Sequence, residues 1–255
     1  MNLLKRVFNK LKRLTSKKGR VNYKNTGTIN LVDIGAVGDL PEPWFDNSFH
    51  VKNLLRFEPN EKSPKTGKHV TTCNFALSNK NETRDFYIYK GFSGSGSSFY
   101  EQNIKYIDEH WDDLKNIGPS ELANTWHERS QLDRKVQIKC KTLDTALANQ
   151  DSDISYDFVK IDAQGAEYEI LSGAEHFLSS SCLGLQLELF NFPILKGIKL
   201  DKEVEAWLSQ RGFYLAKTFP PHGSFNCSSD FLFLREDGMT FNPEKFLLIK
   251  RIYGV

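Results

Sequence analysis

The sequence predicts an α/β fold built on a largely parallel sheet. Short apolar runs alternate along the chain with amphipathic segments, which is the pattern of repeated β-α units. The 255 residues are enough for one such domain with one sizeable core. With 39% hydrophobic and 26% charged residues, the composition is that of a globular protein and argues against general disorder or a fibrous repeat. No stretch approaches the roughly 18 uncharged apolar residues of a membrane span.

The first β-α units are expected before residue 80. A strand is predicted over 28–35, a short helix over 42–49 with Pro43 in its first turn, and a second strand from 51 to Glu58, where Pro59 stops it. Residues 69–78 indicate a third strand. The pattern then changes: 83–90 alternates like an antiparallel strand, 91–98 is a loop rich in glycine and serine, and 101–130 is polar and helical. We therefore predict an insertion at about 83–132.

Regular units return after the insertion. Residues 135–148 indicate a strand followed by a short helix that Thr142 would cap. The next strand ends at Asp162, and a helix begins near Gly165 with acidic residues in its first turn, where the helix dipole favours them. Later elements are a strand over 184–190, a helix over 201–212 and a closing pair of strands over 213–219 and 229–236.

Charge divides the chain into a basic arm, residues 1–24, and a body, residues 25–255. Residues 1–20 hold eight lysines or arginines, which leaves 26 basic against 32 acidic residues in the rest. In the arm, apolar residues recur at helical spacing opposite the lysines (Leu3, Leu4, Val7, Phe8, Leu11 and Leu14). We interpret 1–20 as an amphipathic helix that contacts a membrane surface, with docking on the body as the alternative. Nucleic acid is not an expected partner, because the body is acidic.

The four cysteines lie far apart and form no CxxC pair, so neither a zinc site nor a disulfide framework is predicted. Reduced structural thiols are consistent with a cytoplasmic enzyme. The basic arm additionally suggests that the enzyme is peripheral at the membrane face.

Four of the predicted parallel strands end in carboxylates: Asp33, Glu58, Asp162 and Glu188. Ligands of open parallel sheets bind beyond the carboxyl ends of the strands. Such a site favours a ligand that has hydroxyls and a positive centre.

The turn after the first strand narrows the choice of ligand. Gly35 and Gly38 let the chain turn tightly and let a ligand approach the backbone, but a GxGxxG dinucleotide loop is absent. Asp33 would repel a diphosphate, whereas Glu58 is placed to accept hydrogen bonds from a ribose. These features favour S-adenosylmethionine over a nicotinamide cofactor.

Several segments resemble the FkbM-type methyltransferases and follow the family's order from about residue 28 to 235. They are VDIGAVGDLPEPW, LLRFEPN, FALSNKNETRDFYIY, KTLDTAL, DFVKIDAQGAEYEILSGA, LQLELF and SDFLFL. The resemblance implies a Rossmann-like class I methyltransferase fold with a seven-stranded, mostly parallel sheet whose last strand is antiparallel. It also implies methyl transfer from S-adenosylmethionine to oxygen, on a sugar or another hydroxylated acceptor.

The resemblance also assigns the cofactor residues. Asp33, Gly35, Ala36 and Gly38 would surround the methionine part, Glu58 would bind the ribose, and Asn74, Phe75 and Ala76 would flank the adenine. The loop between Gly35 and Gly38 is one residue shorter than the family's usual loop and is followed by prolines.

Three residues are catalytic candidates. Asp162 would orient or deprotonate the acceptor hydroxyl, or else cap the following helix. Glu188 would bind acceptor hydroxyls or complete a cation site with Asp162, or else be a buried acid paired with a lysine. His222, in the loop before the last strand, suits a general base, unless it is simply exposed. No metal is predicted.

We therefore predict an S-adenosylmethionine-dependent O-methyltransferase that acts on a sugar hydroxyl of a glycan or a lipid-linked glycan. Ser97 and Ser98 would belong to a flap over the acceptor, or to a plain surface turn. A nicotinamide-dependent oxidoreductase and a non-catalytic subunit of a glycan-assembly complex are the alternatives.

Overall fold

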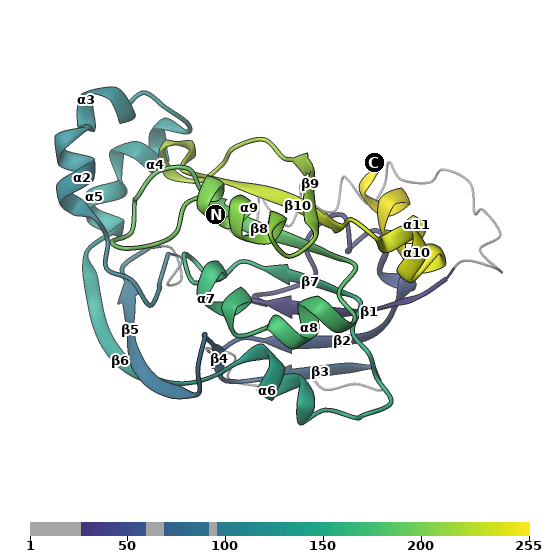
Figure 1. Ribbon diagram of the computed structural model, residues 1–255. Coiled ribbons are helices and arrows are strands. Elements are labelled where there is room, and N and C mark those ends of the chain that lie inside the picture. The colour runs from purple at the N-terminus through teal and green to yellow at the C-terminus, as the bar shows by residue number, and fades with distance from the viewer. Residues whose placement is uncertain (1–26, 60–68, 92–95) are drawn as a thin grey trace.

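A seven-stranded sheet forms the centre of the computed structural model, which describes residues 27–59, 69–91 and 96–255 (Figure 1). The strand order is β3-β2-β1-β7-β8-β10-β9, and β10 runs antiparallel to both of its neighbours. These strands are β1 Ile29–Ile34, β2 Val51–Phe57, β3 Val70–Cys73, β7 Phe158–Ile161, β8 Gly184–Phe190, β9 Phe213–Thr218 and β10 Ser228–Arg235. The predicted fold class is confirmed.

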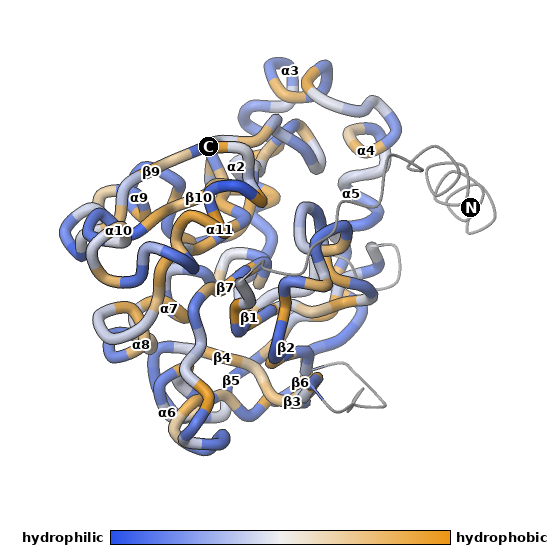
Figure 2. The backbone as a smooth tube through the Cα atoms, turned by 90° about the vertical axis from the view of Figure 1, so that its right-hand side faces the viewer, coloured by the Kyte–Doolittle hydropathy of each residue, from blue (hydrophilic) through white to orange (hydrophobic). Residues whose placement is uncertain are grey.

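Helices cover both faces of the sheet, because its central strands are apolar on both sides. Along β1, Leu31 belongs to one hydrophobic cluster and Val32 to the other. The Val32 cluster includes residues of α7 (Glu167–Ser172), α8 (Glu175–Ser180) and α9 (Asp201–Ser209). The Leu31 cluster includes α11 (Pro243–Tyr253), whose hydrophobic middle is visible in Figure 2. The short helix α10 (Gly238–Phe241) precedes α11.

A second, three-stranded sheet in the order β4-β6-β5 lies beside the first. It consists of β4 Ala76–Leu77, β5 Glu82–Tyr89 and β6 Leu132–Lys141. Between β5 and β6 the described residues form four short helices: α2 Ile104–Glu109, α3 Trp111–Leu114, α4 Ser120–Asn124 and α5 Trp126–Arg129. These helices lie beyond the carboxyl ends of the parallel strands (Figure 1). The predicted insertion therefore sits where an open α/β sheet binds its ligands.

Two predicted elements are wrong. The expected third strand over 69–78 is divided, because β3 pairs with β2 whereas β4 pairs with β6. The expected helix over 42–49 is a series of turns that ends in the 3-10 turn η1 (Ser48–His50). Glu42 precedes Pro43, and the α conformation is sterically disfavoured for the residue before a proline.

Two local predictions further along the chain are confirmed. Thr142 caps α6 (Leu143–Ala148), since its Oγ1 accepts a hydrogen bond from the Thr145 N–H at 3.0 Å. The strands β9 and β10 pair as predicted. The basic arm, residues 1–24, lies outside the described residues. Among the described residues, no helix is long and apolar enough to cross a membrane.

Candidate functional site

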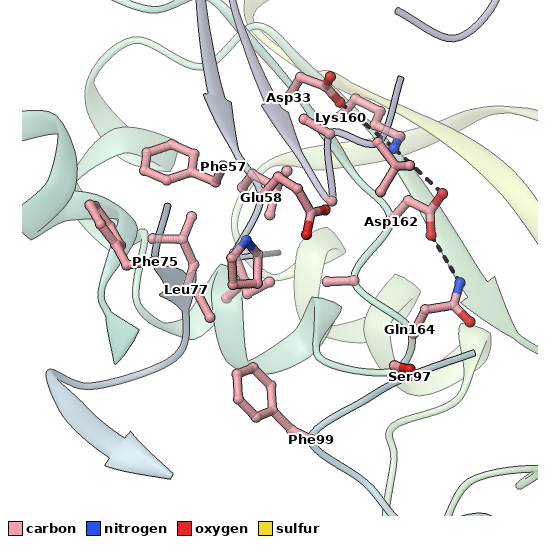
Figure 3. A pocket seen from close by; sticks show the side chains of 18 of the residues that line it. Asp33, Phe57, Glu58, Phe75, Leu77, Ser97, Phe99, Lys160, Asp162 and Gln164 are labelled. Atoms are coloured by element: carbon pink, nitrogen blue, oxygen red, sulfur yellow. Dashed lines mark hydrogen bonds and ion pairs between the residues drawn. The ribbon is translucent and has the colours of Figure 1, made fainter. Parts of the chain in front are cut away.

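A cavity of about 560 Å³ opens at the carboxyl ends of β1, β2 and β7 (Figure 3). Three predicted carboxylates, Asp33, Glu58 and Asp162, line it together. Four other predicted residues also line it: Gly35, Ala36, Phe75 and Ala76. Gly38 and Asn74 do not line this cavity. The acidic strand ends thus surround one hollow.

The cavity has an apolar side and a charged side (Figure 3). Phe57 and Phe75 lie on the apolar side, with ring centroids 5.5 Å apart. Asp162 and Lys160 lie on the opposite side, and the Glu58 side chain points into the space between the two. The segment between β5 and β6 adds Phe99 to the wall. Such a cavity suits a ligand with one flat apolar part and one polar, cationic part.

Asp33 is almost completely buried between two cations. The parallel register sets Arg56 on β2 and Lys160 on β7 beside it. Arg56 Nε lies 3.5 Å from Asp33 Oδ2, and Lys160 Nζ lies 3.7 Å from Asp33 Oδ1. Burial raises the pKa of Asp33, whereas Lys160 and Arg56 act in the opposite direction. Asp33 therefore does not present the bare negative charge that the sequence suggested.

Lys160 connects Asp33 with Asp162. Its Nζ lies 3.5 Å from Asp162 Oδ2, and its side chain is only 8% exposed. Burial disfavours the charged lysine, but Asp162 and Asp33 raise its pKa. The sequence analysis missed Lys160 and Arg56 as site residues. Each of these residues is a cation inside an apolar strand, Lys160 in FVKI and Arg56 in LLRF. This position could have indicated an ion pair, because a buried charge requires a partner.

The two loop glycines have different roles. Gly35 has a φ of +73°, and a Cβ there would overlap the backbone carbonyl of Asp162. Gly38 has a φ of +80°, and a Cβ there would meet nothing within 4 Å. Arg56 Nη2 donates to the carbonyl oxygens of Ala36 and Gly38. The close approach of the Asp162 backbone, at the end of β7, therefore requires a glycine at 35. At position 38 the backbone conformation alone favours glycine.

Gln164 joins two of the predicted catalytic carboxylates. Its Nε2 donates to Asp162 Oδ1 at 3.0 Å and to Glu188 Oε2 at 2.7 Å. Its backbone has a φ of +52°, and its carbonyl oxygen accepts a hydrogen bond from the hydroxyl of Ser98. The sequence analysis missed Gln164. The position of a glutamine in the sequence does not show which carboxylates its side-chain amide will contact. Ser97, the other serine of the predicted flap, lines the cavity.

Asp162 does not cap the following helix. The backbone N–H groups of Ala163 and Gly165 donate to Glu167 Oε1, at 2.9 and 3.3 Å. Burial favours the neutral form of Asp162. The positive charge of Lys160 and the hydrogen bonds that Asp162 accepts from Gln164 and Glu188 outweigh this effect and lower the pKa of Asp162. The structure thus leaves an ionised Asp162 carboxylate at the cavity wall.

Glu188 meets His222 rather than a lysine side chain. Its Oε1 lies 3.2 Å from His222 Nε2 and accepts a hydrogen bond from Ser228 Oγ. Burial and the nearby Asp162 charge raise the pKa of Glu188 well above its ordinary value. His222 does not line the first cavity, and its side chain is 46% exposed. The four residues form a continuous polar chain from Asp162 through Gln164 and Glu188 to His222.

Among the described residues, no three His, Cys, Asp or Glu side chains are grouped so that they could hold a metal ion.

The family model described as the methyltransferase FkbM domain matches residues 33–215, well over half of the chain. The chain belongs to this family. The family match supports S-adenosylmethionine as the cofactor of this FkbM-family chain, and a nicotinamide cofactor is set aside. Among curated proteins, none matches the chain.

Solved structures similar to this FkbM-family chain include the following two. Methyltransferase FkbM from Methylobacillus flagellatus KT is 11% identical with a TM-score of 0.45, over 83% of this chain and 45% of the other. Magnesium protoporphyrin IX methyltransferase from Synechocystis PCC 6803, solved with bound SAM, is 13% identical with a TM-score of 0.38, over 89% and 90%. This chain thus spans less than half the length of the Methylobacillus protein. Because both TM-scores are below 0.5, the assignment rests on the family match.

Proposed function

We propose that this chain transfers a methyl group from S-adenosylmethionine to a hydroxyl of a sugar, in a glycan or a lipid-linked glycan. The observation that carries the oxygen acceptor is the pair Glu188 and His222, whose Oε1 and Nε2 atoms lie 3.2 Å apart. A hydroxyl must lose its proton when it accepts a methyl group, and this pair can carry that proton away. Gln164 only holds Asp162 and Glu188 in place, because its amide nitrogen donates to both carboxylates.

The first cavity has the chemistry needed to hold the cofactor. Phe75 and Ala76 would contact the adenine, and Glu58 would accept hydrogen bonds from the ribose hydroxyls. Asp33, enclosed between Arg56 and Lys160, would support the cavity wall rather than offer the cofactor a free acceptor. When bound, S-adenosylmethionine supplies an electrophilic methyl group on a positively charged sulfur. Asp162, which lines the cavity, would provide negative charge for the positively charged sulfur.

The hydrogen bonds of His222 determine where a proton can go. Its Nδ1 lies 3.0 Å from the Ser228 carbonyl oxygen, which can only accept, so Nδ1 carries the hydrogen. In the neutral ring Nε2 is then an acceptor, and it faces Glu188 Oε1 at 3.2 Å. A proton that arrives at Glu188 can therefore pass to Nε2 and leave through the exposed imidazole.

Isotope transfer tests this proposal. The protein is incubated with methyl-labelled S-adenosylmethionine and a panel of glycans and lipid-linked sugars, and the product is analysed for a new O-methyl group. We expect Glu188→Gln to slow transfer at least about 100-fold while the affinity for S-adenosylhomocysteine stays unchanged. His222→Asn should also slow transfer, because it removes the imidazole that faces Glu188. His176→Asn, on the exposed side of α8, is its control. Binding of S-adenosylhomocysteine without transfer to any acceptor would support a non-catalytic subunit instead.

The lipid-linked acceptor and a cytoplasmic position at the membrane face depend on the basic arm. Eight cations in residues 1–20 would attract anionic lipids, and the apolar residues of the same segment would enter the interface. Flotation of the chain with anionic liposomes, with and without residues 1–20, tests this. Equal flotation of the two forms would refute membrane contact through the arm.

A further inference from the structure

A second cavity, of about 250 Å³, lies next to the first. Gly96 and Gln164 line both cavities, so they form the partition between them. Glu188 lines the second cavity and Asp162 the first, and the Gln164 amide bonds to both carboxylates. The polar chain described above therefore crosses from one cavity to the other.

The helical segment between β5 and β6 builds much of the second cavity. Trp126 and Arg129 of α5 line it, together with Ser224 of the 3-10 turn η3 (Ser224–Asn226). Arg129 Nη2 donates to the carbonyl oxygen of Leu122 at 2.5 Å and to Ser224 Oγ at 2.8 Å. The inserted helices and the loop that carries His222 are thus held together around this hollow.

The lining of the second cavity is half apolar and half polar. Trp126, Phe190, Ile194 and Leu195 supply the apolar part, and Glu188 and Ser228 supply polar atoms. Gln102 also lines the cavity, and its Oε1 is buried without a hydrogen-bond partner. An unsatisfied buried acceptor is unfavourable, and a ligand hydroxyl would satisfy it.

We propose that the second cavity binds a single sugar ring of the acceptor, with Gln102 Oε1 accepting a hydrogen bond from one ring hydroxyl. Glu188 would meet the hydroxyl that is to be methylated, at the partition with the first cavity. This inference rests on the proposed function. An apolar ring face with hydroxyls at its edge matches the mixed lining, and 250 Å³ is below the roughly 300 Å³ of ordinary small-molecule pockets, which argues for one ring.

Methyl NMR tests the proposal without any substitution. The protein, labelled at the methyl groups of Leu, Ile and Val and saturated with S-adenosylhomocysteine, is titrated with D-glucose, D-galactose, D-mannose and N-acetyl-D-glucosamine. We expect at least one sugar to shift the resonances of Ile194 and Leu195. Shifts confined to Ile170 and Val37 of the first cavity, or no shift with any sugar, would overturn the proposal. Equal shifts with glycerol would also overturn it.

A matched pair of variants measures the role of Gln102. Gln102→Leu should weaken sugar binding about tenfold, the effect of one lost hydrogen bond, and Gln210→Leu at an exposed position should leave it unchanged. If Gln102→Leu and the parent chain bound the sugar with equal affinity, the proposed hydrogen bond to Gln102 would be refuted. Calorimetry with S-adenosylhomocysteine distinguishes failure of the proposed function from failure of this inference. Absent cofactor binding refutes the proposed function. Intact cofactor binding without sugar binding refutes only this inference.

Discussion

The backbone carbonyl of Asp162 occupies the place where Gly35 would carry a Cβ atom. This contact brings the loop after β1 against the end of β7, next to the hydrogen bond from the Asp162 N–H to the Ile34 carbonyl oxygen at 3.1 Å. The cavity wall at this point consists of two backbones in direct contact, so its shape depends on the missing side chain.

Gly35→Ala is therefore expected to destabilise the fold more than Gly38→Ala. Both residues have positive φ, which alone costs an alanine about 1–2 kcal/mol. Only Gly35 adds an overlap with backbone atoms, so its substitution should cost several times as much. Urea unfolding of the two variants measures the difference. Equal losses in the free energy of unfolding would show that the β1–β7 contact is unimportant.

Glu58→Gln should weaken the binding of S-adenosylhomocysteine about tenfold or more. The substitution keeps the size of the side chain but replaces a charged acceptor, and hydrogen bonds to charged groups contribute about 1.5–3 kcal/mol. Isothermal titration measures the affinity. Glu101→Gln is the control, because that carboxylate is 51% exposed and pairs with Lys196 outside the first cavity. A Glu58 variant with the affinity of this control would refute the ribose assignment.

Lys160→Met should destabilise the protein by about 3–5 kcal/mol near neutral pH, because Asp33 and Asp162 lose the cation between them. The loss should shrink as the pH falls, since protonation removes the unpaired negative charges. Asp33→Asn combined with Lys160→Met should cost less than the sum of the single changes. Denaturant unfolding at two pH values gives both comparisons, and strict additivity would argue against the ion pair.

Glu167→Gln should remove part of the pH dependence of stability. Burial raises the pKa of Glu167 to about 8, far above that of an unfolded glutamate near 4.3. The unfolded chain therefore releases this proton first, and stability is lost as the pH rises from about 4.3 to 8. The slope is at most about 1.4 kcal/mol per pH unit.

The glutamine variant keeps an oxygen that can accept the Ala163 N–H, but it cannot ionise. Its free energy of unfolding, relative to the parent chain, should thus increase between pH 5 and pH 8.5. A constant difference over that range would mean that Glu167 titrates normally in the folded protein.

Much of the fold could be predicted from local patterns. The apolar runs marked β1, β2, β7 and β8, and Thr142 marked the start of α6, because these signals depend on neighbours within a few residues. The errors occurred where pairing with residues far away in the sequence determines the secondary structure. Residues 69–78 resemble one strand, but β4 leaves the main sheet because β6, more than 50 residues later, offers it a different partner.

The sequence by itself determined that several parallel strands end in carboxylates, since the apolar period and the position of each acid can be read directly. Only the tertiary structure decided how these charges are balanced. Arg56 and Lys160 lie beside Asp33 because β2 and β7 flank β1 in register, and Lys160 is 127 residues away along the chain. Gln164 likewise reaches Glu188 through a backbone with positive φ. Electrostatic pairing depends on distance in space, and strand order, which no local pattern contains, sets that distance.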